Sequence, residues 1–260
     1  MDNEEAIIKS DFDLITKYGD SFAVSLAKAQ LQMLKYKNLI TKKEQIAILE
    51  GFIRDTIKSG KEEGMKKVDL LLCSSFIELE LGEVFRKRFG NRIKNAKVLW
   101  IPFAVNKVFD PGCLIPYFDK LASYGIDKNN IEIATPQTSK ENKYDIIFVA
   151  GGNNQKLKKV LIETGWWEEI KRRIENGVFY IGDSAGTVLC GRGMEFSKQY
   201  EEHVEGVTNY DGYCFIDKFF IVHYQEGNKN YEVKTKIISE LGEGNCTKMS
   251  DKDFLFIDKI

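Results

Sequence analysis

From residue 65 onward, short apolar runs alternate with helical stretches, and this alternation constrains the fold most strongly. Five runs have the length and apolar content of strands buried on both faces: residues 68–73, 97–103, 131–134, 145–150 and 178–181. Helical periodicity fills most of the intervals, over residues 78–89, 114–124, 155–162 and 166–176. Strand alternating with helix predicts an α/β fold with a mostly parallel sheet flanked by helices.

The first 64 residues have a different character, because they are rich in charged residues and their pattern predicts helices. Thr41 and Glu44 form a capping box. Behind it, apolar residues recur at helical spacing: Ile46, Leu49, Ile53 and Ile57. Residues 59–64 have the composition of a polar linker. We therefore expect a helical N-terminal extension at residues 1–64, serving packing or homodimer formation, and one α/β domain at residues 65–260.

Composition excludes several partner classes. Lysine and arginine (38) nearly balance aspartate and glutamate (39), so no net field favours nucleic acid or an anionic membrane. No apolar run reaches the roughly 18–20 residues that span a bilayer, and the acidic N-terminus does not resemble a signal peptide. A cytoplasmic protein is the expectation. The five cysteines form no CxxC pair, so we expect mostly buried thiols and neither a disulfide framework nor a metal site.

The strand at residues 178–181 ends abruptly in Gly182-Asp-Ser-Ala-Gly186. This pattern matches the G-x-S-x-G turn that exposes a nucleophilic serine between a strand and a helix. A helix beginning at Ala185 would direct free backbone N–H groups toward Ser184. The alternative is a glycine-flanked turn in which Ser184 only caps the helix.

Gly151 and Gly152 follow the strand at residues 145–150. Glycines at such a strand end expose backbone N–H groups that bind an oxyanion or a phosphate. The spacing fits neither G-x-G-x-x-G nor a P-loop. The alternative is a flexible strand-to-helix turn.

A nucleophilic serine needs a base, which is normally histidine, and the chain has two histidines. His203 lies in an acidic stretch that is typical of a solvated loop. His223 ends the apolar run at residues 219–222, so we expect it at the same sheet edge as Ser184. A carboxylate should orient the imidazole, and spacing alone does not choose among Glu201, Glu202, Asp211 and Asp217.

Taken together and in order, these segments resemble the dipeptidase E (α-aspartyl dipeptidase) and cyanophycinase serine peptidases over residues 66–258. The matching pieces are LLLCSS at 70–75, VLWIP at 98–102, DIIFVAGGN at 145–153, YIGDSAG at 180–186 and VHY at 222–224. The resemblance implies the fold of class I glutamine amidotransferases.

The same resemblance assigns roles to residues of the site. It implies Ser184 as nucleophile and His223 as general base. It implies an oxyanion hole from the backbone N–H of Ala185 and of Gly151 or Gly152, and it implies Glu201 or Glu202 as the acid.

The chain departs from the family pattern at four places. Ala150 replaces the first glycine of GGG, Asn154 replaces a threonine, and Val222 replaces the proline before the histidine. The acid is glutamate in place of the expected aspartate. No basic residue can be matched to the family's pocket for an N-terminal aspartate side chain, so the resemblance indicates the reaction class better than the substrate.

Three hypotheses follow for the function. The first is a serine peptidase that hydrolyses small peptides through an acyl-enzyme, without metal or organic cofactor. The second is an α/β-hydrolase esterase, which shares the serine turn but has several further strands and a late histidine. Little chain follows Ser184 and His223 for those. The third is a weak or inactive family member that binds a peptide or a protein partner.

Overall fold

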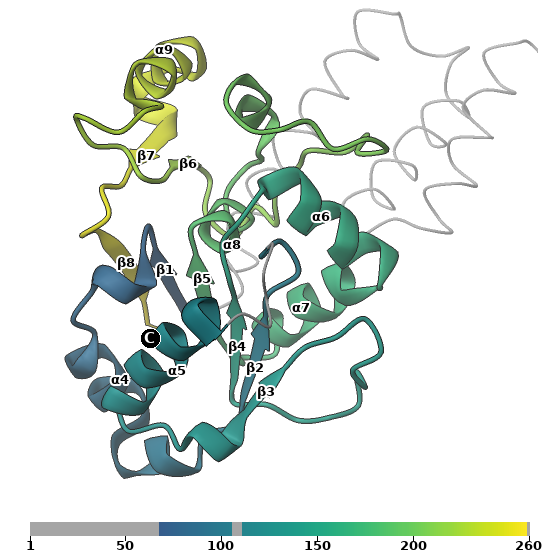
Figure 1. Ribbon diagram of the computed structural model, residues 1–260, viewed down its shortest axis with the longest axis vertical. Coiled ribbons are helices and arrows are strands. Elements are labelled where there is room, and N and C mark those ends of the chain that lie inside the picture. Colours follow the sequence, from purple (N-terminus) through teal and green to yellow (C-terminus); the bar gives the residue numbers. More distant parts are fainter. Residues whose placement is uncertain (1–67, 106–110, 259–260) are drawn as a thin grey trace, which may run out of the picture. The chain divides into compact units, whose positions relative to one another are not determined.

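A computed structural model describes residues 68–105 and 111–258, with the side chain of Pro111 excepted. A six-stranded sheet forms its centre (Figure 1). In spatial order the strands are β3 (Ile131–Ile133), β2 (Val98–Ile101), β4 (Ile146–Val149), β5 (Phe179–Asp183), β1 (Leu70–Cys73) and β8 (Phe254–Ile257). All adjacent pairs are parallel except β1 with β8. The predicted α/β fold with a mostly parallel sheet is therefore confirmed.

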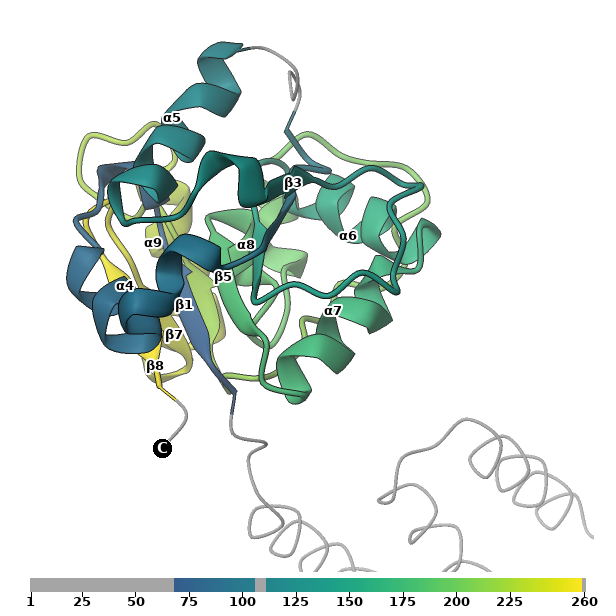
Figure 2. The ribbon, with the colours of Figure 1, turned by 90° about the horizontal axis from the view of Figure 1, so that it is seen from below.

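Helices cover both faces of this sheet (Figures 1 and 2). One face carries α4 (Gly82–Phe89) and α5 (Pro111–Ser123). The other carries α6 (Asn154–Glu163), α7 (Trp166–Glu175) and the short α8 (Ala185–Val188). Short 3₁₀ turns complete the connections: η1 (Phe76–Glu78), η2 (Gly90–Asn95), η3 (Lys128–Asn130), η4 (Glu195–Gln199) and η5 (Glu243–Asn245).

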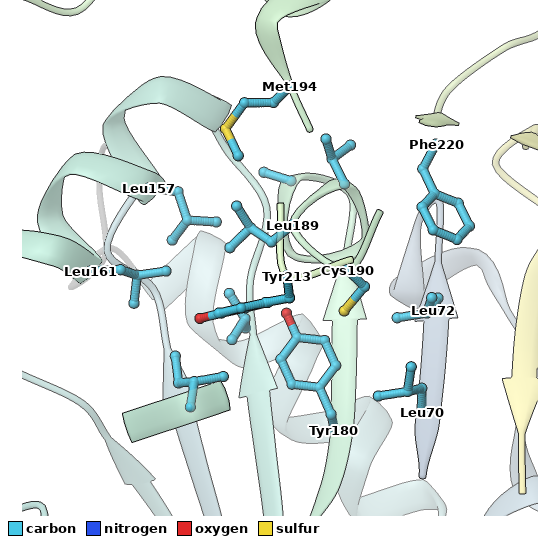
Figure 3. Packing of buried hydrophobic residues seen from close by; sticks show 14 of the residues in the cluster. Leu70, Leu72, Leu157, Leu161, Tyr180, Leu189, Cys190, Met194, Tyr213 and Phe220 are labelled. Atoms are coloured by element: carbon cyan, nitrogen blue, oxygen red, sulfur yellow. The ribbon is translucent and has the colours of Figure 1, made fainter. Parts of the chain in front are cut away.

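Alternate side chains of each strand enter different halves of the core, as the two-residue repeat of a strand requires. Leu70, Leu72 and Tyr180 point to the side of α6, where they pack near Leu157 and Leu161 (Figure 3). The strand residues that alternate with these face the opposite side of the sheet. They belong to an aromatic-rich cluster under α4 and α5, which contains Phe76, Phe85, Trp100, Phe148 and Phe179. These side chains are fully buried, and each contributes about 1.5–3 kcal/mol relative to exposure to water. The core thus fixes the strands whose ends carry the site.

The predicted strand ahead of His223 does not join the central sheet. It forms β6 (Phe219–Ile221), which pairs in parallel with β7 (Cys246–Lys248) in a separate two-stranded sheet. The helix α9 (Tyr231–Leu241) connects these two strands in the chain. In Figure 1, β6, β7 and α9 form a group beside the main sheet. Neither β7 nor β8 is predicted from the sequence, because both are short and lie among charged residues.

The predicted N-terminal extension at residues 1–64 lies outside the described residues. Within the part of the chain that the structure describes, no helix is both long enough and apolar enough to cross a membrane.

Candidate active site

Ser184 occupies the turn between β5 and α8. Its backbone has φ 51° and ψ −107°, an unusual conformation for a residue with a β-carbon. The turn is tight because α8 approaches β4 closely. A β-carbon added to Gly186 would lie only 2.2 Å from the carbonyl oxygen of Val149. The G-x-S-x-G segment therefore forms a strained turn with Ser184 half-buried at its apex.

His223 follows β6 and reaches Ser184 from the second sheet. Nε2 of His223 lies 2.8 Å from Oγ of Ser184, within hydrogen-bonding distance. His223 also has a positive φ of 51°, and its backbone N–H donates to Oγ of Ser74 at 2.7 Å. The imidazole is thus held from its backbone as well as from its ring. The other histidine, His203, is exposed, as predicted.

Asp251 supplies the carboxylate at the other ring nitrogen, since Nδ1 of His223 is hydrogen-bonded to Oδ1 of Asp251. An ionised carboxylate only accepts hydrogen bonds, so Nδ1 carries the proton and Nε2 is free to accept from the hydroxyl of Ser184. The side chains of His223 and Asp251 are 33% and 28% exposed. The serine, imidazole and carboxylate therefore form one hydrogen-bonded chain that is partly exposed to solvent.

Parallel pairing of β6 with β7 explains why two residues far apart in sequence meet here. In the register of this pair, Ile221 lies opposite Lys248, so the carboxyl ends of both strands lie side by side. His223 and Asp251 follow these ends within a few residues. Strand pairing, not proximity in the chain, positions the carboxylate.

Polar neighbours fix the orientation of the Asp251 carboxylate. Gln225 Nε2 donates to Oδ2 at 3.1 Å. The hydroxyl of Ser74 lies 3.4 Å from Oδ1 and 3.3 Å from the carbonyl oxygen of Met249. Ser74 is fully buried and follows β1, so it connects the main sheet to both His223 and Asp251.

Lys234 of α9 is buried next to this group. Its ammonium donates to the carbonyl oxygen of Val222 at 2.9 Å, one residue before His223. Burial lowers the pKa of Lys234, while the charges of Asp251 and Glu201 act in the opposite direction. This lysine therefore ties α9 to the histidine segment and places a positive charge close to both carboxylates.

The expectation that Glu201 or Glu202 orients the imidazole is corrected by this arrangement. The Glu201 carboxylate binds Asn154 instead, with Oε2 3.0 Å from the backbone nitrogen and Oε1 2.6 Å from Nδ2. Glu202 is exposed, and its backbone oxygen accepts from Nδ2 of Asn153 at 2.8 Å. The loop that carries both glutamates is therefore bound to the N-terminus of α6, by the side chain of Glu201 and by the backbone of Glu202, and the imidazole is bound by Asp251 instead. The two other candidates are engaged elsewhere too, Asp217 with Arg192 and Asp211 with Asn209.

Gly151 and Gly152 lie beside the serine turn, as predicted for these residues. A β-carbon added to Gly151 would lie 3.0 Å from Cβ of Ser184. Gly152 has φ 126°, and a β-carbon there would lie 2.5 Å from the carbonyl oxygen of Ala104, so only glycine fits. Ala185 is the first residue of α8, next to Ser184. The predicted oxyanion residues are therefore gathered around Ser184.

Asp183 precedes Ser184 and is a buried carboxylate that the sequence analysis did not single out. It accepts hydrogen bonds from the backbone N–H of Phe76 at 2.8 Å and from the hydroxyl of Tyr117 at 2.7 Å. Burial raises the pKa of Asp183, and these donors, together with the backbone N–H of Gly151, lower it in part. The carboxylate thus joins β5 to the segments that surround Ser184.

Asp251 and Ser74 are the main residues that sequence reasoning missed. The available signal for Asp251 was a short apolar and polar run, Cys246–Met249, that ends in a polar turn. This signal is weak because Asp251 follows the histidine in the chain, outside the interval between Ser184 and His223 that holds the candidate acids. Ser74 follows a buried strand, which marks the carboxyl end of a parallel sheet, where functional groups gather.

Within the described residues, no group of three or more His, Cys, Asp or Glu side chains is arranged to hold a metal ion. The five cysteines are free thiols, of which Cys73 and Cys190 are buried and Cys214 is exposed.

Comparison with known families identifies the domain. The model of peptidase family S51 matches residues 70–259. The chain belongs to peptidase family S51. It is therefore a peptidase of the serine class, as the sequence resemblance predicts.

Individual relatives that are named peptidases agree with this assignment. The chain is 31% identical over 144 residues to the uncharacterized peptidase Lmo0363 of Listeria monocytogenes, covering 53% of this chain and 70% of that protein. It is 34% identical over 70 residues to Peptidase E of Streptomyces coelicolor, covering 27% of this chain and 29% of that protein. A crystal structure from Listeria monocytogenes EGD-e, named after Peptidase E, superimposes with a TM-score of 0.61 and 25% identity, covering 73% of this chain and 94% of that one.

Proposed function

We propose that this S51 domain hydrolyses small peptides through a covalent acyl-enzyme on Ser184, with His223 as general base and Asp251 as the orienting carboxylate. The observation that carries the proposal is the 2.8 Å contact between Oγ of Ser184 and Nε2 of His223. A serine hydroxyl is a weak nucleophile at neutral pH and becomes effective when an imidazole accepts its proton during attack.

In the acylation step, Oγ of Ser184 attacks the carbonyl carbon of the scissile peptide bond. Its proton passes to Nε2 of His223, and the carboxylate of Asp251 stabilises the imidazolium that forms. The C–N bond then breaks, and the imidazolium donates the proton to the leaving amine. In the deacylation step, His223 takes a proton from water as the water oxygen attacks the acyl ester. The bond between the acyl carbon and Oγ then breaks, the imidazolium returns the proton to Oγ of Ser184, and the carboxylic acid product leaves. The residues named supply every proton transfer, so no metal or organic cofactor is required.

The backbone N–H groups of Ala185 and Gly152 are the proposed donors to the oxyanion. Ala185 is the first residue of α8, where the helical pattern provides no acceptor for the N–H. Gly152 adjoins Gly151, which packs against Ser184. The N–H of Gly151 acts on the carboxylate of Asp183, which favours Gly152 over Gly151 as the second donor. Such preorganised donors stabilise charge that develops on the carbonyl oxygen in the transition state.

The substrate class, a short peptide, is supported by family membership and by relatives that are named peptidases. Peptide chemistry also suits the balanced charge of the chain, which provides no field for nucleic acid.

A hydrolysis screen of dipeptides and tripeptides, read by mass spectrometry, tests the proposal. The set includes Asp-X, Glu-X and neutral N-terminal residues, and Ser184→Ala is the control. We expect at least one peptide to be cleaved by the wild type and none by the variant. Cleavage that persists in Ser184→Ala would contradict the mechanism. Peptide binding without turnover in the wild type would favour the binding-protein hypothesis.

A further inference from the structure

The segment Gly151–Asn154 joins β4 to α6 and passes beside Ser184; it is called the oxyanion loop below. Two buried or half-buried carboxylates contact opposite ends of it. Asp183 interacts with the N–H of Gly151 at the start of the loop. Glu201 binds Asn154 at the end of the loop through both of its carboxylate oxygens. The loop is therefore held from the β5 side and from the 200–205 segment together.

The contact of Glu201 is two-pronged and specific. Oε2 accepts the backbone N–H of Asn154 at 3.0 Å, one of the N–H groups that a helix leaves unsatisfied in its first turn. Oε1 accepts from Nδ2 of Asn154 at 2.6 Å. Asn154 itself is 3% exposed, so these bonds are shielded from competing water. Loss of either acceptor would leave a buried donor unpaired.

The side chain of Asn153 provides a second connection between the oxyanion loop and the loop at residues 200–205. Its Oδ1 accepts the N–H of Lys156, which caps α6, and its Nδ2 donates to the backbone oxygen of Glu202. The end of the oxyanion loop thus depends on where the loop at residues 200–205 lies, and Glu201 is the charged residue that fixes it.

We infer that Glu201 is a positioning residue for hydrolysis, which sets the oxyanion loop by binding Asn154 and so aligns the N–H of Gly152 with the carbonyl carried on Ser184. The inference rests on the proposed function. Glu201 touches neither the serine nor the histidine, so its effect falls on stabilisation of the transition state more than on substrate binding.

The charge of Glu201 matters because only the ionised form provides two acceptors for the two donors of Asn154. The groups that face it are Tyr200 on its own segment, Ser197 of η4, Asn154 of α6 and Lys234 of α9. Burial raises the pKa of Glu201 to about 7, although its hydrogen bonds and the charge of Lys234 act in the opposite direction. Above neutral pH the loop is therefore held by a carboxylate, and below it by a carboxylic acid whose proton opposes the donors of Asn154.

The test compares Glu201→Gln with Glu205→Gln, an exposed glutamate of the same loop. In E201Q one carboxylate oxygen is replaced by an amide donor and the negative charge is lost, so the backbone N–H and the side chain of Asn154 no longer share a charged acceptor. We expect kcat to fall by about 10–100-fold, with KM within about threefold, because the change acts on oxyanion stabilisation. The E205Q variant should match the wild type. When kcat is plotted against pH, the decrease on the acidic side should involve one ionising group fewer in E201Q than in the wild type.

A compensating change distinguishes positioning from general damage. In the double variant Asn154→Asp with Glu201→Gln, the donor and acceptor are exchanged across the same contact. We expect the kcat of the double variant to be at least about tenfold higher than that of E201Q, because the effects of residues in contact are coupled. Should E201Q fail to fold, Glu201→Asp, which keeps the charge but is one methylene shorter, is measured instead with an intermediate loss expected.

The outcomes separate this inference from the proposed function. Turnover that is absent in Ser184→Ala but equal in E201Q and E205Q would overturn the role of Glu201 and leave the proposed function intact. Turnover that survives in Ser184→Ala would overturn the proposed function. If the wild type cleaves no peptide, the rate at which a fluorophosphonate labels Ser184 is compared in E201Q and E205Q, and equal rates would overturn the inference.

Discussion

Nδ1 of His223 is hydrogen-bonded to Asp251, although 28 residues separate them in the chain. Between them lies α9, the helical connection between the parallel strands β6 and β7. Parallel strands need such a crossover, and their equivalent ends then meet at one edge. The candidate triad is therefore assembled from two sheets: Ser184 comes from the central one, while His223 and Asp251 come from the small one.

Asp251→Asn should abolish most activity while leaving the fold intact. The amide is neutral and cannot stabilise the imidazolium as the carboxylate does. With its oxygen facing the Nε2 donor of Gln225, its NH2 group faces Nδ1 and donates to it, which holds the ring in the wrong tautomer. We expect kcat/KM to fall on the order of 10²–10⁴-fold. Steady-state peptide hydrolysis measures it. The matched control is Asp258→Asn, which removes a surface ion pair with Lys87 at 2.9 Å and should change activity little. Wild-type turnover in D251N would exclude Asp251 from the triad.

Gly186→Ala should destabilise the domain strongly. The added β-carbon would lie 2.2 Å from the carbonyl oxygen of Val149, and backbone at that distance has to move. We expect a loss of about 3 kcal/mol or more in the free energy of unfolding, measured by urea denaturation. Gly244→Ala is the comparison, because no atom lies within 4 Å of a β-carbon built there. Equal stability of the two variants would show that α8 is not packed tightly against β4.

Glu201 should make stability depend on pH in a way that Glu201→Gln lacks. Burial raises its pKa from the ordinary 4.5 to about 7 in the folded state. Between these values the folded state binds the proton more strongly than the unfolded state, so this contribution is present below about pH 4.5 and is lost as the pH rises through 7. Relative to E201Q, the free energy of unfolding of the wild type should fall by up to about 3 kcal/mol as the pH rises from 4.5 to 8. Urea unfolding of both proteins at several pH values measures the difference, and parallel curves would contradict the raised pKa.

The local sequence pattern was sufficient to predict most of the central sheet. The runs that became β1, β2, β4 and β5 are buried on both faces and therefore apolar along their whole length. In helices such as α7, the helical spacing of the apolar residues is visible within one or two turns. These signals are local, so they survive without knowledge of what packs against them.

The acid of the site, Asp251, could not be predicted from a local sequence pattern. Its position depends on β6 pairing with β7 outside the main sheet, a contact between segments 27 residues apart in register, from Phe219 to Cys246. Glu201 and Glu202 occupied the expected place in sequence, yet the 200–205 loop turns toward the start of α6. Ser184 and His223 were predictable because a turn motif and an apolar strand end mark them individually.

Covalent labelling by a fluorophosphonate, followed by peptide mapping with mass spectrometry, measures directly whether Ser184 is the activated nucleophile. Such a reagent reacts with a serine only where a base and an oxyanion hole activate it. We predict a single adduct on Ser184, which forms much more slowly in Asp251→Asn and is absent in Ser184→Ala. A wild-type protein that hydrolyses peptides but carries no adduct on Ser184, or an adduct on another residue, would contradict this prediction.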